Sequence, residues 1–115
     1  MASRVYLHIG ASKTGTTYLQ GLLHANRGRL AKSGMLFPSP LQDHFRFMLT
    51  ALDRINDIRR GRLAHTAFDR VVDEVRAWDG SALVSNELLA AATPKQVDRV
   101  VSAFAPAEVH VVYTV

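Results

Sequence analysis

Residues 5–17 read VYLHIGASKTGTT, a short apolar run followed by a loop that carries glycines. The apolar run is β-branched and aromatic and stops at Gly10, which predicts a strand buried on both faces. Beyond the loop, Leu19, Leu22, Leu23 and Leu30 recur at helical spacing, and Gly34 suits the position after a helix end. The expected order is therefore strand, glycine loop, helix.

The loop GASKTGTT, residues 10–17, nearly matches the P-loop pattern, with two glycines five apart and a hydroxyl residue in the closing position. It departs from that pattern because Thr16 occupies the usual lysine position and the lysine stands inside the loop, at Lys13. Successive backbone N–H groups and the positive end of the following helix would bind an anion. The simpler alternative is a turn that only starts a helix, and the flanking strand and helix favour the anion site.

The rest of the chain continues the alternation of strands and helices. Short strands are expected at 35–37, 82–85 and 109–115. Strands separated by helices imply right-handed crossovers and a parallel sheet, which predicts an α/β fold.

Helix starts and core faces are also predicted. Capping boxes are expected at Ser39 to Gln42 and at Thr93 to Gln96, and a cap at Thr66 with Asp69. Among the histidines, His8 is expected to be a hydrogen-bonded core residue, whereas His24 and His44 are expected on helix surfaces. The predicted apolar stripes are Phe45, Met48, Leu49, Leu52 and Ile55; Phe68, Val71, Val72, Val75 and Trp78; and Val97, Val100, Val101 and Phe104.

Composition indicates one globular domain over residues 1–115. The chain is 48% hydrophobic and has no cysteine, which excludes a disordered chain and a disulfide scaffold. No apolar run approaches the roughly 20 residues of a membrane span, and no secretory signal is present, so a cytoplasmic protein without a membrane partner is expected. The net charge of +4 is a mild preference for anions. The cluster Arg54, Arg59, Arg60 and Arg62 lacks interleaved aromatics, so a solvated face is expected rather than a nucleic-acid or anionic-acceptor site.

Lys13-Thr14-Gly15-Thr16-Thr17, preceded by His8-Ile9-Gly10 and followed by Leu19-Gln20, closely resembles one known loop. The known loop is the 5′-phosphosulfate-binding loop of bacterial sulfotransferases that use 3′-phosphoadenosine 5′-phosphosulfate. The resemblance implies a P-loop three-layer α/β sandwich that transfers a sulfuryl group to a hydroxyl or amine of a small molecule or carbohydrate. It also implies that the fold is incomplete at its C-terminus, because the family's 3′-phosphate contacts follow the last strand.

The resemblance assigns roles to individual residues. Lys13 is the implied catalytic residue, which neutralises charge on the bridging oxygen as adenosine 3′,5′-bisphosphate leaves. No metal is required by this arrangement. The implied donor-binding residues are Ser12, Lys13, Thr14, Gly15, Thr16 and Thr17.

Glu87 is the second candidate for catalysis, because Ser85-Asn86-Glu87 ends the strand predicted at 82–85. By resemblance it is a possible general base for the acceptor, with Ser85 as a possible polar contact. Two simpler roles remain open: Glu87 caps the short helical turn from Leu88 to Ala92, or it pairs with a nearby arginine.

Two other classes of function remain open as alternatives. In a P-loop kinase or nucleotide-binding enzyme, Thr17 would hold magnesium and Glu87 would be the acidic residue of the second strand. A non-catalytic anion-binding module is the other alternative. The last strand, apolar and poor in charge, is also expected to promote self-association.

Overall fold

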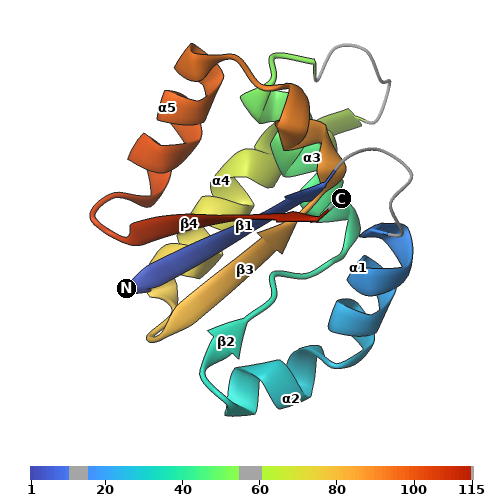
Figure 1. The fold of residues 1–115 in the computed structure, drawn as a ribbon, viewed down its shortest axis with the longest axis vertical. Coiled ribbons are helices and arrows are strands. Elements are labelled where there is room, and N and C mark those ends of the chain that lie inside the picture. Colours follow the sequence, from blue (N-terminus) through green and yellow to red (C-terminus); the bar gives the residue numbers. More distant parts are fainter. Residues whose placement is uncertain (11–15, 55–60, 115) are drawn as a thin grey trace.

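The computed structural model describes residues 1–10, 16–54 and 61–114 (Figure 1). In chain order its elements are β1 (Arg4–Gly10), α1 (Thr16–Ala25), α2 (Arg27–Lys32), β2 (Met35–Leu36), α3 (Gln42–Ala51), α4 (Gly61–Ala77), β3 (Ser81–Ser85), the 3-10 helix η2 (Glu87–Ala91), α5 (Pro94–Phe104) and β4 (Glu108–Thr114). Within these described ranges, no helix is both long and apolar enough to cross a membrane.

The strands form one sheet in the order β2-β3-β1-β4, and every neighbouring pair is parallel. The first strand of the sequence is therefore central: Arg4 pairs with Ser81 on one side and with Glu108 on the other. The predicted α/β class and parallel sheet are confirmed.

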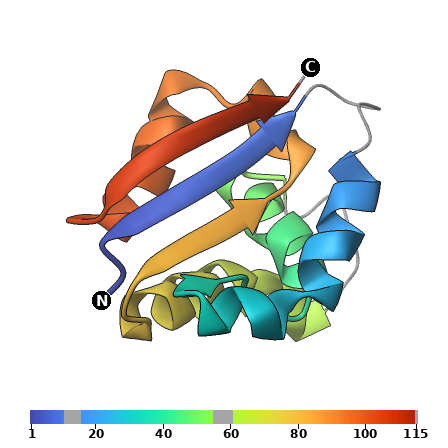
Figure 2. The ribbon, with the colours of Figure 1, turned by 60° about the horizontal axis from the view of Figure 1, so that its bottom comes forward.

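The strand order determines which face each helix covers. The connection from β1 to β2 passes β3 in one direction, whereas the connections from β2 to β3 and from β3 to β4 run in the opposite direction. Right-handed crossovers then place α1 and α2 on one face and α3, α4 and α5 on the other. In Figures 1 and 2, α1 and α2 lie beside β2 and β3, away from α5, which is consistent with the expected three-layer sandwich.

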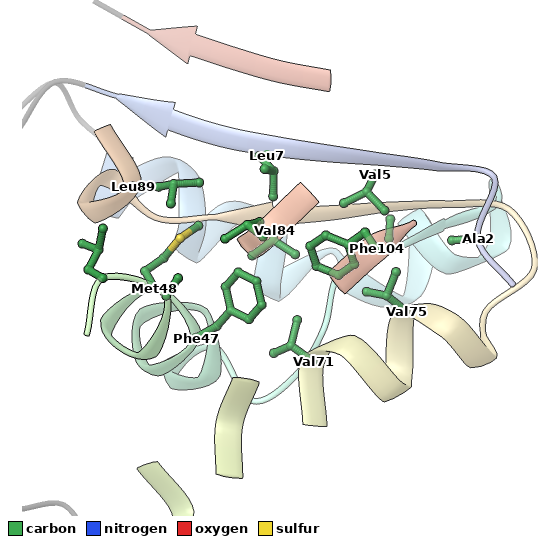
Figure 3. Close-up of a cluster of buried hydrophobic side chains, with 14 residues drawn as sticks. Ala2, Val5, Leu7, Phe47, Met48, Val71, Val75, Val84, Leu89 and Phe104 are labelled. Atoms are coloured by element: carbon green, nitrogen blue, oxygen red, sulfur yellow. The ribbon is translucent and has the colours of Figure 1, made fainter. Parts of the chain in front are cut away.

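The core fills the face that α3, α4 and α5 cover (Figure 3). The Phe47 ring stacks on Phe68 at 4.7 Å and on Phe104 at 5.7 Å, measured between ring centroids, so aromatic rings join these three helices. The main buried side chains are Val5, Leu7, Phe47, Met48, Val71, Val75, Ala82, Val84, Leu89, Val100 and Phe104.

The α1 and α2 layer differs from the sequence expectation. A single helix up to Gly34 was expected, but α1 ends at Ala25 and α2 begins at Arg27. Asn26 interrupts the helix with φ −103° and ψ 14°, and its side chain donates to the Leu22 carbonyl. Asparagine competes in this way for backbone hydrogen bonds. Leu22, one of the four leucines that recur at helical spacing, is exposed.

Of the three predicted helix starts, only that of α5 is confirmed. Thr93 Oγ1 accepts from the Gln96 backbone and Gln96 Oε1 accepts from the Thr93 backbone. The box predicted from Ser39 to Gln42 is wrong, because a backbone turn precedes α3 and its N-cap makes no side-chain hydrogen bond. The cap predicted at Thr66 is wrong as well, because α4 begins at Gly61 and Thr66 lies inside it.

The predicted core stripes are only partly right. In α3, Phe47 is fully buried and Phe45 only partly. In α5, Val97 and Val101 are exposed although both were expected to face inward. The edge strand β4 also exposes large apolar side chains, namely Val111, Val112 and Tyr113. Only Val100 and Phe104 of the four predicted residues are buried, so the apolar stripe of α5 is narrower than predicted.

Candidate functional site

The carboxyl ends of β1 and β3 lie side by side at the point of the sheet where the connections that follow the strands leave in opposite directions. These strands are neighbours, but the connection after β1 leaves toward α1 and the connection after β3 leaves toward α5. Ligands of open α/β sheets bind in the crevice beyond the strand ends at such a switch point. The register pairs His8 with Ser85 and Gly10 with Thr114, so the predicted loop and the Asn86-Glu87 segment leave the same edge of the sheet.

The elements around the predicted anion loop are as expected. β1 ends at Gly10 and α1 begins at Thr16. The residues between them, Ser12, Lys13, Thr14 and Gly15 among them, lie outside the described residues, and so do the side chains of Thr16 and Thr17. The strand and the helix are confirmed, and the anion contacts remain predictions.

Glu87 is the first residue of η2 and is half-buried. The cap of η2 is Asn86, whose Oδ1 accepts from the Leu88 N–H at 3.0 Å, so the suggestion that Glu87 caps this turn is wrong. The Asn86 N–H donates to the His8 carbonyl at 3.1 Å. Glu87 therefore follows directly on a backbone segment that is bonded to β1.

A buried polar contact joins the two strand ends. His8 Nδ1 lies 2.8 Å from Ser85 Oγ, and both side chains are buried. The expectation of His8 as a hydrogen-bonded core residue is confirmed. Ser85 was expected only as a possible acceptor contact, and it is fully buried.

His44 extends this polar contact, and its predicted place on a helix surface is wrong. The side chain is 1% exposed. Its Nε2 donates to the Pro38 carbonyl at 2.7 Å, and its Nδ1 accepts the Ser85 backbone N–H at 3.0 Å. The sequence carried a signal for this burial, because His44, Phe47, Met48 and Ala51 follow the i, i+3, i+4, i+7 spacing of one helix face.

His8 and His44, two of the five histidines, are neutral at pH 7. Burial lowers the pKa of His44 to about 4 and also lowers the pKa of His8. Because a carbonyl can only accept and a backbone N–H can only donate, His44 carries its proton on Nε2. Protonation of Nδ1 would displace the Ser85 N–H.

Asp43 precedes His44 but belongs to a different set of contacts. Its carboxylate accepts from Arg70 at 3.0 and 2.8 Å and from Arg46 at 3.1 Å. Burial raises the pKa of Asp43, but the hydrogen bonds from Arg70 and Arg46 outweigh burial and hold it below its ordinary value. This ion pair joins α3 to α4 and stabilises their packing.

A cavity of about 330 Å³ lies beside this ion pair, between the β2–α3 connection and α4. Burial raises the pKa of Glu74, which lies in its wall. The cavity contains none of the predicted site residues, so it is not assigned as the phosphosulfate site. Among the residues with a described placement, no group of three or more His, Asp or Glu is arranged to hold a metal ion. The cavity is lined by Pro38, Ser39, Asp43, Arg70, Val71, Asp73 and Glu74.

Comparison of the chain with protein-family models, with curated proteins and with solved structures returned no match. The functional assignment therefore depends on the loop sequence and on the elements that surround it.

Proposed function

We propose that this chain is the donor-binding portion of a sulfotransferase that uses 3′-phosphoadenosine 5′-phosphosulfate. One observation carries the proposal. The residues that resemble the phosphosulfate loop connect the central strand β1, which ends at Gly10, to α1, which begins at Thr16, at the switch point of the sheet. A glycine loop that opens a helix is suited to bind a phosphate group.

In the proposed reaction, a bond forms between the acceptor oxygen or nitrogen and sulfur, and the bond from sulfur to the bridging oxygen of the donor breaks. Lys13 neutralises the negative charge that grows on the bridging oxygen. Gly15, Thr16 and Thr17 hold the 5′-phosphate. Glu87 takes the proton of the acceptor group, and its place at the carboxyl end of β3 supports this role. The acceptor is a small molecule or a carbohydrate, and the proposed location is the cytoplasm.

The first test concerns Lys13. Calorimetry with adenosine 3′,5′-bisphosphate is expected to show binding by the wild-type protein and weaker binding by Lys13→Ala. In the sulfotransferase that contains this sequence, the same change should lower turnover more than binding, by about 10²- to 10³-fold, because the charge on the bridging oxygen is greatest in the transition state. Lys32→Ala, at an exposed position in α2, is the matched control. An unchanged rate for Lys13→Ala would refute the role of Lys13.

The second test separates the sulfotransferase from a P-loop kinase. Binding of adenosine 3′,5′-bisphosphate and sulfuryl transfer should persist in excess chelator, because Lys13 and the loop amides provide the positive charge. A strict requirement for magnesium would favour the kinase.

The third test concerns Glu87. Glu87→Gln should lower turnover with little loss of donor affinity or thermal stability, because only the proton acceptor is removed. Normal turnover by this variant would leave Glu87 as a structural residue of η2.

A further inference from the structure

The Ser85 backbone is held from both sides at the end of β3. β2 pairs with β3 at Met35 and Leu36, and among the residues that the structure describes no strand lies beside β3 beyond Ala82 on that side. The Asn86 N–H points toward β1, where the His8 carbonyl accepts it. The Ser85 N–H points the opposite way, as alternation along a strand requires, and His44 Nδ1 accepts it where β2 has ended.

His44 itself is locked by two backbone groups. The Pro38 carbonyl and the Ser85 N–H fix both the orientation of the ring and the position of its proton. The Phe37 ring stacks on the imidazole with centroids 4.2 Å apart. The hydroxyl of Ser85 is therefore carried on a backbone that can shift little in either direction.

Ser85 Oγ reaches His8, two residues before β1 ends at Gly10. Three hydrogen bonds thus run from Pro38 through His44 and Ser85 to His8, from the β2–α3 connection to the strand that leads into the predicted loop.

The buried pair of His8 and Ser85 has a cost in folding free energy that a pair of apolar side chains would avoid. Burying a hydroxyl and an imidazole is unfavourable unless both are hydrogen-bonded, and an apolar pair of similar volume packs without that requirement. The main core cluster is made of apolar side chains, whereas this polar chain lies at the carboxyl ends of β1 and β3, where ligands of such sheets bind.

We infer that Ser85 and His44 are positioning residues of the donor site: through His8 they fix the end of β1 from which the loop departs. This inference rests on the proposed function. The predicted consequence is a change in anion affinity that is separate from any change in stability, because a loop whose anchor can rotate presents its N–H groups in poorer alignment.

The experiment measures the affinity for adenosine 3′,5′-bisphosphate by calorimetry at 10 °C, with circular dichroism to establish that every variant is folded. Ser85→Ala and His8→Leu should each weaken binding about tenfold, and the double variant should bind no more weakly than either one, since both changes break the same contact. His8→Asn should bind within about threefold of the wild type, because the asparagine amide can occupy the position of Nδ1 and keep the bond to Ser85.

Val75→Ala is the matched control for stability. Val75 is buried in α4, and its carbonyl accepts from the Ala2 N–H, which precedes the amino end of β1, whereas the loop follows the other end of this strand at Gly10. This variant should lose stability and keep wild-type affinity. If it loses as much affinity as Ser85→Ala, the effect of Ser85 is only on stability and the inference is wrong.

Two other outcomes would decide whether the inference and the proposed function stand. Wild-type affinity in Ser85→Ala or in His8→Leu would overturn the inference and leave the proposed function standing. Absence of binding by the wild-type protein would overturn both.

Discussion

The two helical layers of this protein differ in how they are held to the sheet. The layer of α3, α4 and α5 contributes Phe47, Val71, Val100 and Phe104 to the core, all nearly or fully buried. In the other layer, α2 has no buried residue and α1 exposes 75% of Tyr18. The helix that follows the predicted anion loop thus belongs to the weakly packed layer, and most of the core that stabilises the fold lies on the opposite face of the sheet from this helix.

The largest difference between the layers should appear when a core ring is removed. Phe47→Ala deletes the ring that stacks on both Phe68 and Phe104 and is expected to lower the free energy of unfolding by about 3 to 5 kcal/mol. Urea unfolding monitored by circular dichroism measures the change. A loss below about 1.5 kcal/mol would mean that the two layers do not differ in the way their burial indicates.

The next largest effect should be the pH dependence of the free energy of unfolding, which His44 in the layer of α3, α4 and α5 causes. The folded state lowers the pKa of His44 to about 4 from 6.5, so the unfolded chain takes up a proton first as the pH falls. Stability is therefore fully present above about pH 6.5 and is lost as the pH falls toward 4, by about 3 kcal/mol from this residue. His8, whose pKa is also lowered, acts in the same direction.

The control for this effect is His44→Gln, compared with the wild type by urea unfolding at pH 7 and pH 4.5. The variant should be less stable at pH 7 and should lose less stability on acidification. The variant must be compared with the wild type because Glu74, whose pKa is raised in the folded state, adds stability as the pH falls. Equal acid sensitivity in both proteins would exclude His44 as its source.

A smaller contrast is expected between helix caps in the two layers. Thr93 and Gln96 form a reciprocal capping box at the start of α5, whereas Asn26 precedes α2 without a side-chain cap bond. Thr93→Ala should cost about 1 kcal/mol, and Asn26→Ala should cost clearly less. Thermal unfolding of the two variants side by side measures this difference, and a reversed order would contradict it.

The smallest effect is expected at Tyr18 in α1. Its side chain is mostly exposed, so Tyr18→Ala should change the free energy of unfolding by no more than about 0.5 kcal/mol. Urea unfolding under the conditions used for Phe47→Ala makes the values comparable. A loss of 2 kcal/mol would show that this face of α1 is packed in solution.

Local signals in the sequence were sufficient for the strands and for one helix start. The apolar runs that begin at Val5, Ala82 and Val109 all became parallel strands, and the box at Thr93 formed as expected. Each depends on neighbouring residues only. The starts of α3 and α4 were mispredicted because a Ser or Thr followed three residues later by Gln or Asp also occurs where no helix begins. A backbone turn precedes α3, and Thr66 lies inside α4.

The candidate site was likewise predicted only in part from the sequence. The sequence placed a glycine loop between a strand and a helix, and the strand and helix are where they were expected. His44 was missed because its role depends on where β2 stops, which leaves the Ser85 N–H without a strand partner. The length of a neighbouring strand is not encoded near His44, although the helical spacing from His44 to Ala51 indicates a buried face.

The central position of β1 also affects how the chain folds during synthesis. Its partner residues in β3 and β4 lie far along the sequence, since Arg4 pairs with Ser81 and with Glu108. At a translation rate of about 5 to 20 residues per second, this strand leaves the ribosome several seconds before its second neighbour exists. Such long-range pairing makes folding slow compared with that of a helical bundle of the same length. During that interval the apolar side of β1 is exposed, and a chaperone that shields short apolar segments would increase the yield of folded protein.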